Sequence, residues 1–422
     1  MGSLALFAYL AASRLAGVLA PTLLRKRMHR GKEDPARLGE RLGLAGMERP
    51  KGQLIWLHGA SVGEAMSLLP LIRALHARVD ACVLLTTGTV TSANRIGDLL
   101  PMGAIHQYVP VDTSNAVRGF LDHWQPDLAI WAESELWPRL VVETSRRGIP
   151  MAMVNARLSA RSHARWQKAP AMARTLLSTF DLILAQDHET VARLSDFDTD
   201  AHFVGNLKAL VEMPDPDADT LERFRAAIGD RPVWLAASTH EGEEDDLLQL
   251  QCAVGPNANG LMILAPRHPE RADKIAVLIR SKRLTMARRS AGEMPSAETH
   301  VYLADSLGEM ALWYALASVT FVGGSFVEKG GHTPFEPIAA RSVVMHGPHV
   351  DNFAPAYAAL NKAHAVWLFE NSYVAAEGLD RLLTDPVARA RLNEAAFDVH
   401  ASLKPAVDAM AAQLLELMEA RP

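Results

Sequence analysis

Residues 322–337 (VGGSFVEKGGHTPFEP) hold the densest set of ligand-binding groups, with four glycines, two glutamates, a lysine and a histidine. They follow the apolar run 318–322, which predicts a buried strand that leads into a ligand loop. The glycines allow positive φ and close approach to a bound group, and Thr333–Glu336 has the residue order of a capped helix start. A helix N-terminus behind a glycine loop suits an anion. A tight strand-to-helix connection would look the same, so this stretch alone leaves both interpretations open.

Charged residues also follow the other predicted strands, in the loops 58–64, 132–138, 204–208, 238–242, 266–271 and 305–309. Four glutamates lie three residues after Ser or Thr, which is the capping-box spacing at helix starts: Glu64, Glu241, Glu309 and Glu336. Capping explains any one of them better than catalysis does. Four such residues at the strand exits of one cleft are harder to explain by capping alone.

The same loops carry cations that a phosphate leaving group would need. Arg267 and Arg271 flank a His-Pro pair, and Lys208 follows the last strand of the first half. Either arginine could instead pair with a neighbouring carboxylate. His332 fits a loop hydrogen bond as well as it fits a base.

The elements that position these loops repeat in a strand-helix pattern typical of parallel sheets. Short apolar runs predict strands at 54–57, 82–85, 127–131, 151–154 and 182–185, and, after the Pro-rich polar break 213–219, at 232–237, 261–265, 301–303, 318–322 and 343–345. We therefore predict an α/β fold of two Rossmann-like, doubly wound domains that face a cleft. Ligands bind such sheets beyond the carboxyl ends of the strands.

The composition is that of an ordinary globular chain of 422 residues, with 49% hydrophobic and 22% charged residues. A net charge of −5 gives no reason to expect nucleic acid. The two cysteines, Cys82 and Cys252, are far apart and form no metal-ligand pattern, which favours a reducing, cytosolic setting.

The first 32 residues have a membrane-binding pattern. Leu4–Leu24 is apolar except for Arg14, and a basic cluster follows it at 25–32. The positive charge lies after the apolar run, which argues against a signal peptide. Because Arg14 and Pro21 oppose spanning, we expect a helix that dips into one leaflet, with the basic cluster facing cytoplasmic head groups. The alternative is a first helix buried in the globular domain.

An ordered series of motifs gives this chain its family resemblance: 61–64 (SVGE), 133–138 (ESELWP), 155–159 (NARLS), 238–243 (STHEGE), 266–271 (PRHPER) and 323–332. In this order they resemble the Kdo transferases of lipopolysaccharide assembly, which move 3-deoxy-D-manno-octulosonic acid (Kdo) from CMP-Kdo to lipid A precursor. Two positions depart from the family pattern. Thr333 stands where the family usually has Asn, and Ala209-Leu210 stand where it usually has Phe-Asp.

The resemblance implies a glycosyltransferase of the GT-B type with a membrane anchor and basic flank (1–32), an acceptor domain (33–212) and a CMP-Kdo-binding domain (213–422). It implies Glu64 as general base, with Glu133 and Lys208 as stabilisers of the transition state. The residues it implies for CMP binding are Pro266, Arg267, Leu307, Gly308, Glu309, Thr333, Pro334, Phe335 and Glu336. The implied partners are CMP-Kdo, lipid A precursor (lipid IVA) and inner-membrane lipid, at the cytoplasmic face of the bacterial inner membrane; the oligomeric state and the number of Kdo residues transferred stay open.

No metal or other cofactor is expected. Because CMP leaves as a monophosphate, Lys208, Arg267 and a helix N-terminus can neutralise its charge without a divalent ion. The Asp-x-Asp sequences at 196–198 and 215–217 lie in polar connections, where they predict solvated turns.

Two other classes of protein stay open. A nucleotide-sugar epimerase of the same two-domain architecture would share the nucleotide site but would not need the apolar arm. A non-catalytic membrane scaffold would keep the arm and lose the glutamate and lysine set, which this chain retains.

Overall fold

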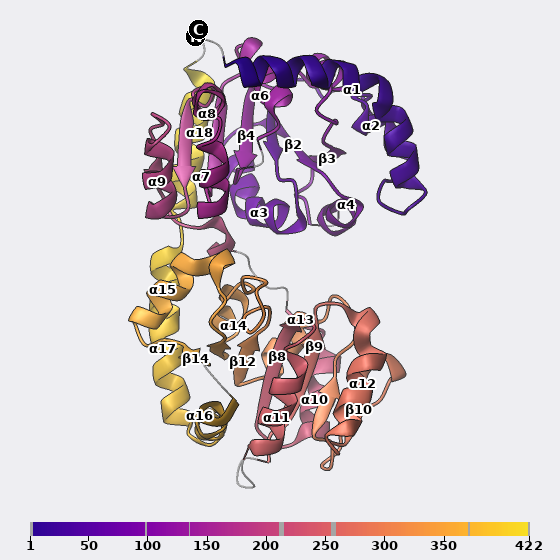
Figure 1. Ribbon diagram of the computed structural model, residues 1–422, viewed down its shortest axis with the longest axis vertical. Helices are drawn as coiled ribbons and strands as arrows, with labels where there is room; N and C mark the ends of the chain where they lie inside the picture. Colours follow the sequence, from indigo (N-terminus) through magenta and orange to yellow (C-terminus); the bar gives the residue numbers. More distant parts are fainter. Residues whose placement is uncertain are drawn as a thin grey trace. The chain divides into compact units, whose positions relative to one another are not determined.

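The computed structural model describes residues 3–97, 99–134, 136–210, 215–254, 259–369 and 372–420 (Figure 1). The chain forms two compact units, one of Met1–Val211 with Lys404–Pro422 and one of Glu212–Leu403. The predicted second domain ran to residue 422. The last helix instead packs on the first unit, so that part of the predicted domain division is wrong.

The first unit is built on a parallel sheet with the strand order β3-β2-β1-β4-β5-β6-β7. Its strands are β1 (Gln53–His58), β2 (Ala81–Thr87), β3 (Ile105–Tyr108), β4 (Leu128–Ala132), β5 (Met151–Ala156), β6 (Leu182–Ala185) and β7 (His202–Phe203). The five predicted strands of this half are confirmed, and the short β3 and β7 were missed. The strand order reverses at β1, which pairs with both β2 and β4, and such a switch point is where a doubly wound sheet binds ligands.

Helices cover both faces of this sheet. They are α1 (Leu4–Met28), α2 (Leu38–Arg41), α3 (Val62–His76), α4 (Val90–Gly97), α5 (Ser114–Trp124), α6 (Pro138–Arg146), α7 (Ala160–Trp166), α8 (Pro170–Leu177), α9 (His188–Ser195) and α18 (Val407–Glu419). One core layer holds Trp56 and Trp131, and the other holds Leu57 and Ile130, because neighbouring strand residues point to opposite faces. Met410, Ala411, Leu414 and Met418 of α18 belong to the second layer, which places the C-terminal helix in this unit.

The second unit repeats the architecture with the strand order β10-β11-β9-β8-β12-β13-β14, again parallel. Its strands are β8 (Val233–Thr239), β9 (Leu261–Pro266), β10 (Met286–Arg288), β11 (Val301–Leu303), β12 (Val319–Val322), β13 (Val343–His346) and β14 (Trp367–Leu368). Its helices are α10 (Ala218–Ile228), α11 (Glu244–Ala253), α12 (Ala272–Ser281), α13 (Met310–Leu316), α14 (Phe335–Ala339), α15 (Ala354–Lys362), α16 (Ser372–Thr384) and α17 (Pro386–Leu403). The predicted strands are confirmed, and the short β10 and β14 were missed. The fold class is therefore confirmed as two doubly wound, Rossmann-like α/β units.

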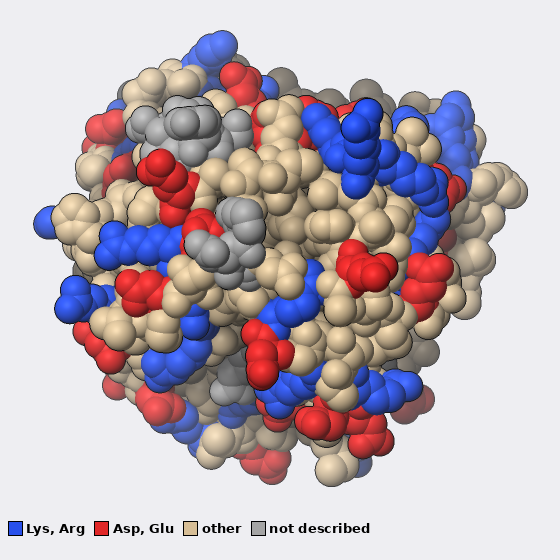
Figure 2. Space-filling view, turned by 90° about the horizontal axis from the view of Figure 1, so that it is seen from below, with Lys and Arg blue, Asp and Glu red and all other residues tan. Residues whose placement is uncertain are grey.

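The distribution of charge on the face shown in Figure 2 agrees with the small net charge of −5. Basic and acidic side chains are interspersed over this face. A nucleic-acid-binding surface would instead gather basic residues in one stripe or patch.

Helix α1 lies along the first unit and packs on α5, α6 and α8 through one face, which includes Leu6 and Leu24. The opposite face is exposed and, except for Arg14, apolar; its large apolar side chains are Leu4, Phe7, Leu15, Val18, Leu19 and Leu23. In the described part of the chain, α1 is the one helix long and apolar enough to cross a membrane, although such helices also occur in soluble proteins. Only 17% of the apolar stretch of this helix is buried. The alternative of a helix buried in the globular domain therefore applies only to the face that packs on the first unit.

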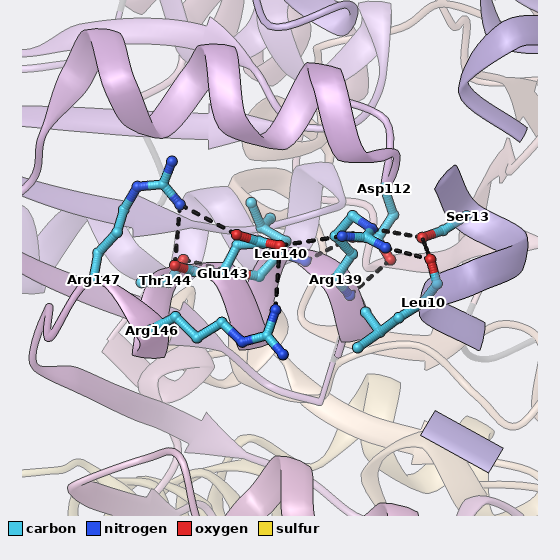
Figure 3. A network of polar contacts seen from close by, with 9 residues as sticks. All are labelled: Leu10, Ser13, Asp112, Arg139, Leu140, Glu143, Thr144, Arg146 and Arg147. Carbon is cyan, nitrogen blue, oxygen red and sulfur yellow. Dashed lines mark hydrogen bonds and ion pairs between the residues drawn. The ribbon is translucent and has the colours of Figure 1, made fainter. Parts of the chain in front are cut away.

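A buried polar network fastens α1 to α6 (Figure 3). The Arg139 guanidinium donates to the Ser13 hydroxyl (2.6 Å) and the Leu10 carbonyl of α1, and it pairs with Glu143 (3.1 Å). The side chains of Arg139 and Glu143 are each 7% exposed. Removing one partner of a buried ion pair costs about 3–5 kcal/mol, because the other charge is left uncompensated. The network therefore makes α1 an integral part of the first unit.

Asp112 strengthens the same attachment. Its carboxylate accepts hydrogen bonds from the Tyr9 hydroxyl of α1 (2.8 Å) and from the backbone N–H groups of Arg139 (3.0 Å) and Leu140 (2.8 Å) at the start of α6. One carboxylate thus satisfies two N–H groups of a helix N-terminus and holds a second helix against it.

Candidate active site

Glu64 lies in the first turn of α3, directly after the exit of β1, where the sheet order reverses. Its carboxylate accepts hydrogen bonds from the Ala60 N–H and the Ser61 hydroxyl, both at 2.8 Å. Ser61 is the N-cap of α3 and accepts the Glu64 N–H (3.3 Å), so the predicted capping box at this position is confirmed. Gly59 is required beside it, because a Cβ there would lie 2.9 Å from the Ala65 nitrogen.

Both oxygens of the Glu64 carboxylate accept hydrogen bonds from the residues that precede α3. The residue is 8% exposed and both oxygens are held, so the group is fixed in position. The structure thus holds a carboxylate in a fixed position at a strand exit, where doubly wound sheets bind ligands.

Glu133 follows β4, the direct neighbour of β1, at the same edge of the sheet. Its φ of 58° is left-handed, and its N–H donates to the Val154 carbonyl (3.0 Å). The carboxylate forms an ion pair with the Lys208 ammonium, which lies on the short 3₁₀ helix η1 (Leu207–Leu210). The structure thus brings the predicted residues Glu133 and Lys208 into contact.

Asn155 positions this ion pair, and our sequence reasoning gave it no role. It is fully buried with a left-handed φ of 51°, and its side-chain oxygen accepts the Leu207 N–H (2.9 Å) at the start of η1. Its side-chain nitrogen has no hydrogen-bond partner among the described residues. The signal was a polar residue at the end of an otherwise apolar strand, inside the 155–159 motif.

The glycine loop after β12 donates its backbone N–H groups to a carboxylate of the protein, that of Glu243. The Glu243 carboxylate is fully buried and accepts the N–H groups of Gly324 (2.8 Å), Ser325 (3.0 Å) and Phe326 (2.9 Å). A fourth N–H, from His240, donates to the same carboxylate (2.8 Å). The expectation that the backbone of this part of the loop approaches a bound ligand is therefore wrong at residues 324–326. Glu243 instead holds the loop rigid, a role that the sequence reasoning missed.

The predicted helix start at Thr333–Glu336 is displaced by one residue. Helix α14 begins at Phe335, with Pro334 as N-cap, and the Thr333 hydroxyl accepts the Phe335 N–H (3.3 Å). Glu336, in the first turn of α14, lies near the buried Tyr314 hydroxyl. Burial, and then this carboxylate, raise the pKa of Tyr314 well above its ordinary value. Pro334 and Phe335 are buried, whereas Thr333 and Glu336 are partly exposed at the loop surface.

Two more of the four predicted capping boxes are not formed as expected. Helix α11 begins at Glu244 with Glu243 as its N-cap, so Glu241 is an exposed loop residue. The Glu309 carboxylate pairs with Arg289 (2.5 Å) and accepts the Ser306 hydroxyl, but α13 begins only at Met310. The hydrogen bond from Arg289 lowers the pKa of Glu309, which keeps it ionised.

The turn before Glu309 presents two more of the predicted CMP-binding residues. Leu307 is 70% exposed, and Gly308 has a φ of 87°, a left-handed value at which a side chain would be strained. These residues follow β11, two strands from β8 at the same sheet edge.

The two predicted arginines have different environments. Arg271 forms two hydrogen bonds with the Glu244 carboxylate (2.7 and 3.0 Å), as the alternative interpretation allowed. Arg267 follows Pro266 at the end of β9, is exposed, and donates its backbone N–H to the Thr239 carbonyl (3.0 Å). Its guanidinium has no carboxylate partner among the described residues, which leaves it able to bind a ligand anion.

The Asp-x-Asp residues have structural contacts. Asp198 pairs with Arg174 (2.8 Å), and Asp217 is the N-cap of α10, where it accepts the Thr220 N–H (2.8 Å). Within the described ranges no group of three or more His, Cys, Asp or Glu side chains is arranged to hold a metal ion.

Comparison with known proteins adds family membership to this geometry. Residues 36–211 match the family model described as 3-deoxy-D-manno-octulosonic-acid transferase (kdotransferase). The 3-deoxy-D-manno-octulosonic acid transferase of Haemophilus influenzae is 36% identical over 371 residues, which cover 86% of this chain and 87% of that protein.

Solved structures share the fold at low identity. The UDP-GlcNAc 2-epimerase of Neisseria meningitidis bound to UDP-GlcNAc is 13% identical with a TM-score of 0.60, covering 86% of this chain and 100% of that chain. A glycosyltransferase from Rickettsia africae is 10% identical with a TM-score of 0.59, covering 88% of this chain and 98% of that chain. At such identities these likenesses concern the fold alone.

The fold is therefore that of a two-domain GT-B glycosyltransferase. Within that architecture, the chain belongs to the 3-deoxy-D-manno-octulosonic acid transferase family and is a Kdo-transferring glycosyltransferase.

Proposed function

We propose that this enzyme transfers Kdo from CMP-Kdo to lipid A precursor (lipid IVA), with inversion and without a metal ion. Two side chains carry the proposal, one in each unit. The first unit fixes the Glu64 carboxylate at the β1 exit, whereas the second presents the Arg267 guanidinium, without a carboxylate partner in the described chain, at the β9 exit. A base and a phosphate-binding cation are what attack by a hydroxyl on a sugar phosphate requires.

In this mechanism Glu64 takes the proton of an acceptor hydroxyl as the hydroxyl oxygen bonds to the anomeric carbon of Kdo. The bond from that carbon to the phosphate oxygen breaks, and CMP leaves with both electrons. Attack on the face opposite the phosphate inverts the anomeric centre. The Lys208–Glu133 pair would stabilise the charge that develops in the transition state.

We assign CMP binding to the second unit, at the loops after β9, β11 and β12. The contributing residues would be Pro266, Arg267, Leu307, Gly308, Glu309, Thr333, Pro334, Phe335 and Glu336. The environments of these residues support different roles. Arg267 would supply the cation, the exposed Leu307–Gly308 turn would supply a surface for the nucleoside, and Thr333 would supply a hydroxyl at the α14 start.

The test is to incubate the full chain with CMP-Kdo and lipid IVA and to weigh the lipid products. We expect the lipid to gain mass in steps of one Kdo residue, with CMP released only when the lipid is present. Release of CMP without acceptor, or an epimerised nucleotide sugar, would contradict the proposal and favour the epimerase alternative.

Replacement of Arg267 by alanine should weaken CMP binding by about 1.5–3 kcal/mol, roughly 10- to 150-fold, because a charge-assisted hydrogen bond to phosphate is lost. Calorimetric titration with CMP would measure it. Arg280→Ala is the matched control, since Arg280 is exposed at the far end of α12. Equal affinity of the Arg267 and Arg280 variants would remove Arg267 from the CMP site.

We further propose that α1 binds the cytoplasmic face of the inner membrane as a helix lying in one leaflet. Its outward face is apolar except for Arg14, and its inward face is fixed to α6 by the Arg139 network. Arg25, Lys26 and Arg30 follow the apolar face and are exposed, and each would add up to about 1 kcal/mol of attraction to anionic lipid. Arg27 contributes less, because it pairs with Glu33 (2.6 Å).

A triple substitution of Leu15, Val18 and Leu19 by glutamate should release the protein from anionic vesicles and leave CMP affinity unchanged. These side chains are 74%, 80% and 62% exposed, so the change removes membrane contact without opening the core. Sedimentation with vesicles is the measurement. Val277→Glu, on an exposed apolar residue of α12, is the control. Sedimentation of the triple variant at the wild-type level would contradict the membrane role of α1.

A further inference from the structure

Three histidine rings gather at the strand exits of the second unit. His240 follows β8, His268 follows β9, and His332 lies in the glycine loop after β12. The His240 and His332 rings are nearly parallel (10°) with centroids 5.2 Å apart, and the His268 ring lies 5.9 Å from His240. Neither the mechanism nor the CMP-binding residues proposed above use these rings.

The hydrogen bond between the His240 and His332 rings determines which ring nitrogens carry protons. The two Nε2 atoms are 3.0 Å apart, which is a hydrogen-bond distance, so one of them carries a hydrogen and the other offers its lone pair. A neutral pair then has one Nδ1–H donor and one Nδ1 acceptor. If the pair gains one proton, the Nε2–H···Nε2 bond persists and both Nδ1 atoms become donors.

The pair is held rigidly in this arrangement. The backbone N–H of His240 donates to the Glu243 carboxylate (2.8 Å), and the backbone N–H of His332 donates to the Gly323 carbonyl (3.2 Å). The Tyr357 hydroxyl donates to the His332 carbonyl (3.1 Å). No hydrogen bond joins either Nδ1 atom to another described residue.

Burial and the surrounding charge favour the neutral pair until an anion arrives. Burial, followed by repulsion from neighbouring cationic groups, lowers the pKa of both rings, for His332 to about 4. The positively charged neighbours are Arg267 and Lys329, and the His268 ring lies between His240 and the Glu270 carboxylate. The acidic neighbours are already engaged, since Glu244 pairs with Arg271 and Glu243 accepts four backbone N–H groups.

We propose that the His240–His332 pair is an anion-binding element of the donor site, which takes up one proton when the phosphate or carboxylate of the donor binds and then offers two Nδ1–H donors. This inference rests on the proposed function. A bound anion offsets the repulsion from Arg267 and Lys329, and so makes the singly charged pair stable. The affinity for the anion should therefore fall as pH rises, by up to about tenfold per pH unit for one linked proton.

The experiment is calorimetric titration of the full chain with CMP and with CMP-Kdo, near neutral pH, in two buffers of different ionisation enthalpy. For the wild type we expect uptake of about one proton per ligand bound. Uptake with CMP identifies the phosphate as the partner, and uptake with CMP-Kdo alone identifies the carboxylate. Binding of both ligands without proton uptake overturns the inference and leaves the proposed function intact. Failure of the wild type to bind either ligand overturns both.

The variants His240→Gln and His332→Gln separate proton uptake from loop structure. Glutamine can form hydrogen bonds but cannot take up a proton, so both variants should lose the uptake and the pH dependence of affinity. His300→Gln is the control, because His300 binds Thr285 elsewhere in the unit and should leave the uptake unchanged. If one variant fails to fold, the other still decides. Undiminished uptake in a folded variant overturns the inference.

Discussion

Glu64→Gln should reduce transfer by about 10²- to 10⁴-fold, the contribution typical of a positioned general base, while CMP affinity stays at the wild-type value. The acceptor hydroxyl would still bind, but no group would take its proton during attack. The measurement is the initial rate of Kdo transfer to lipid IVA, with CMP affinity determined in parallel by calorimetry.

The structure explains why this variant should fold. A glutamine side-chain oxygen can accept the Ala60 N–H, and its amide can donate to the Ser61 oxygen when that hydroxyl rotates. Both hydrogen bonds of the cap are therefore retained. The thermal midpoint of the variant should stay close to that of the wild type, which separates loss of the base from loss of the cap.

The matched control is Asp187→Asn. Asp187 is another buried carboxylate at a helix start of the same unit, where it accepts the Thr190 N–H (2.6 Å) as the N-cap of α9. Asparagine is an equally good N-cap, so the change should leave both stability and transfer nearly unaffected. Transfer by Glu64→Gln within tenfold of the wild-type rate would contradict the general-base role and leave Glu64 as a capping residue.

The sequence predicted what depends on local pattern. Apolar runs placed the central strands of both sheets, and the Ser61–Glu64 spacing placed a capping box, because strand burial and helix capping involve residues that are near one another in sequence. Of the four missed strands, β7 and β14 have two residues each, which is too short for a pattern to distinguish from a loop.

Contacts between distant segments could not be predicted from single motifs. Glu243 binds N–H groups more than eighty residues later in the chain, and His240 meets His332 across a similar separation. Nothing in either local sequence specifies these pairings. The C-terminal helix α18 was misassigned for the same reason, since its apolar face fits either unit by composition and only packing on α3 decides.

The ion pair between Lys208 and Glu133 should be as important to transfer as the base. Lys208→Met should lower the transfer rate by about 10²- to 10³-fold, the usual effect of removing one preorganised electrostatic group from an active site. The same change also leaves the Glu133 carboxylate without its ammonium partner. Because the Glu133 side chain is only 14% exposed, this variant should be less stable as well as less active.

The double variant Lys208→Met with Glu133→Gln separates these two effects. Removing the uncompensated charge should restore much of the thermal midpoint lost in Lys208→Met, because the cost comes from a buried unpaired carboxylate. Transfer should not recover, since neither charge remains to act on the transition state. In a double-mutant cycle the losses in rate should be far from additive, as expected for groups that act as one unit. Recovery of transfer together with stability would show that the pair only supports the fold.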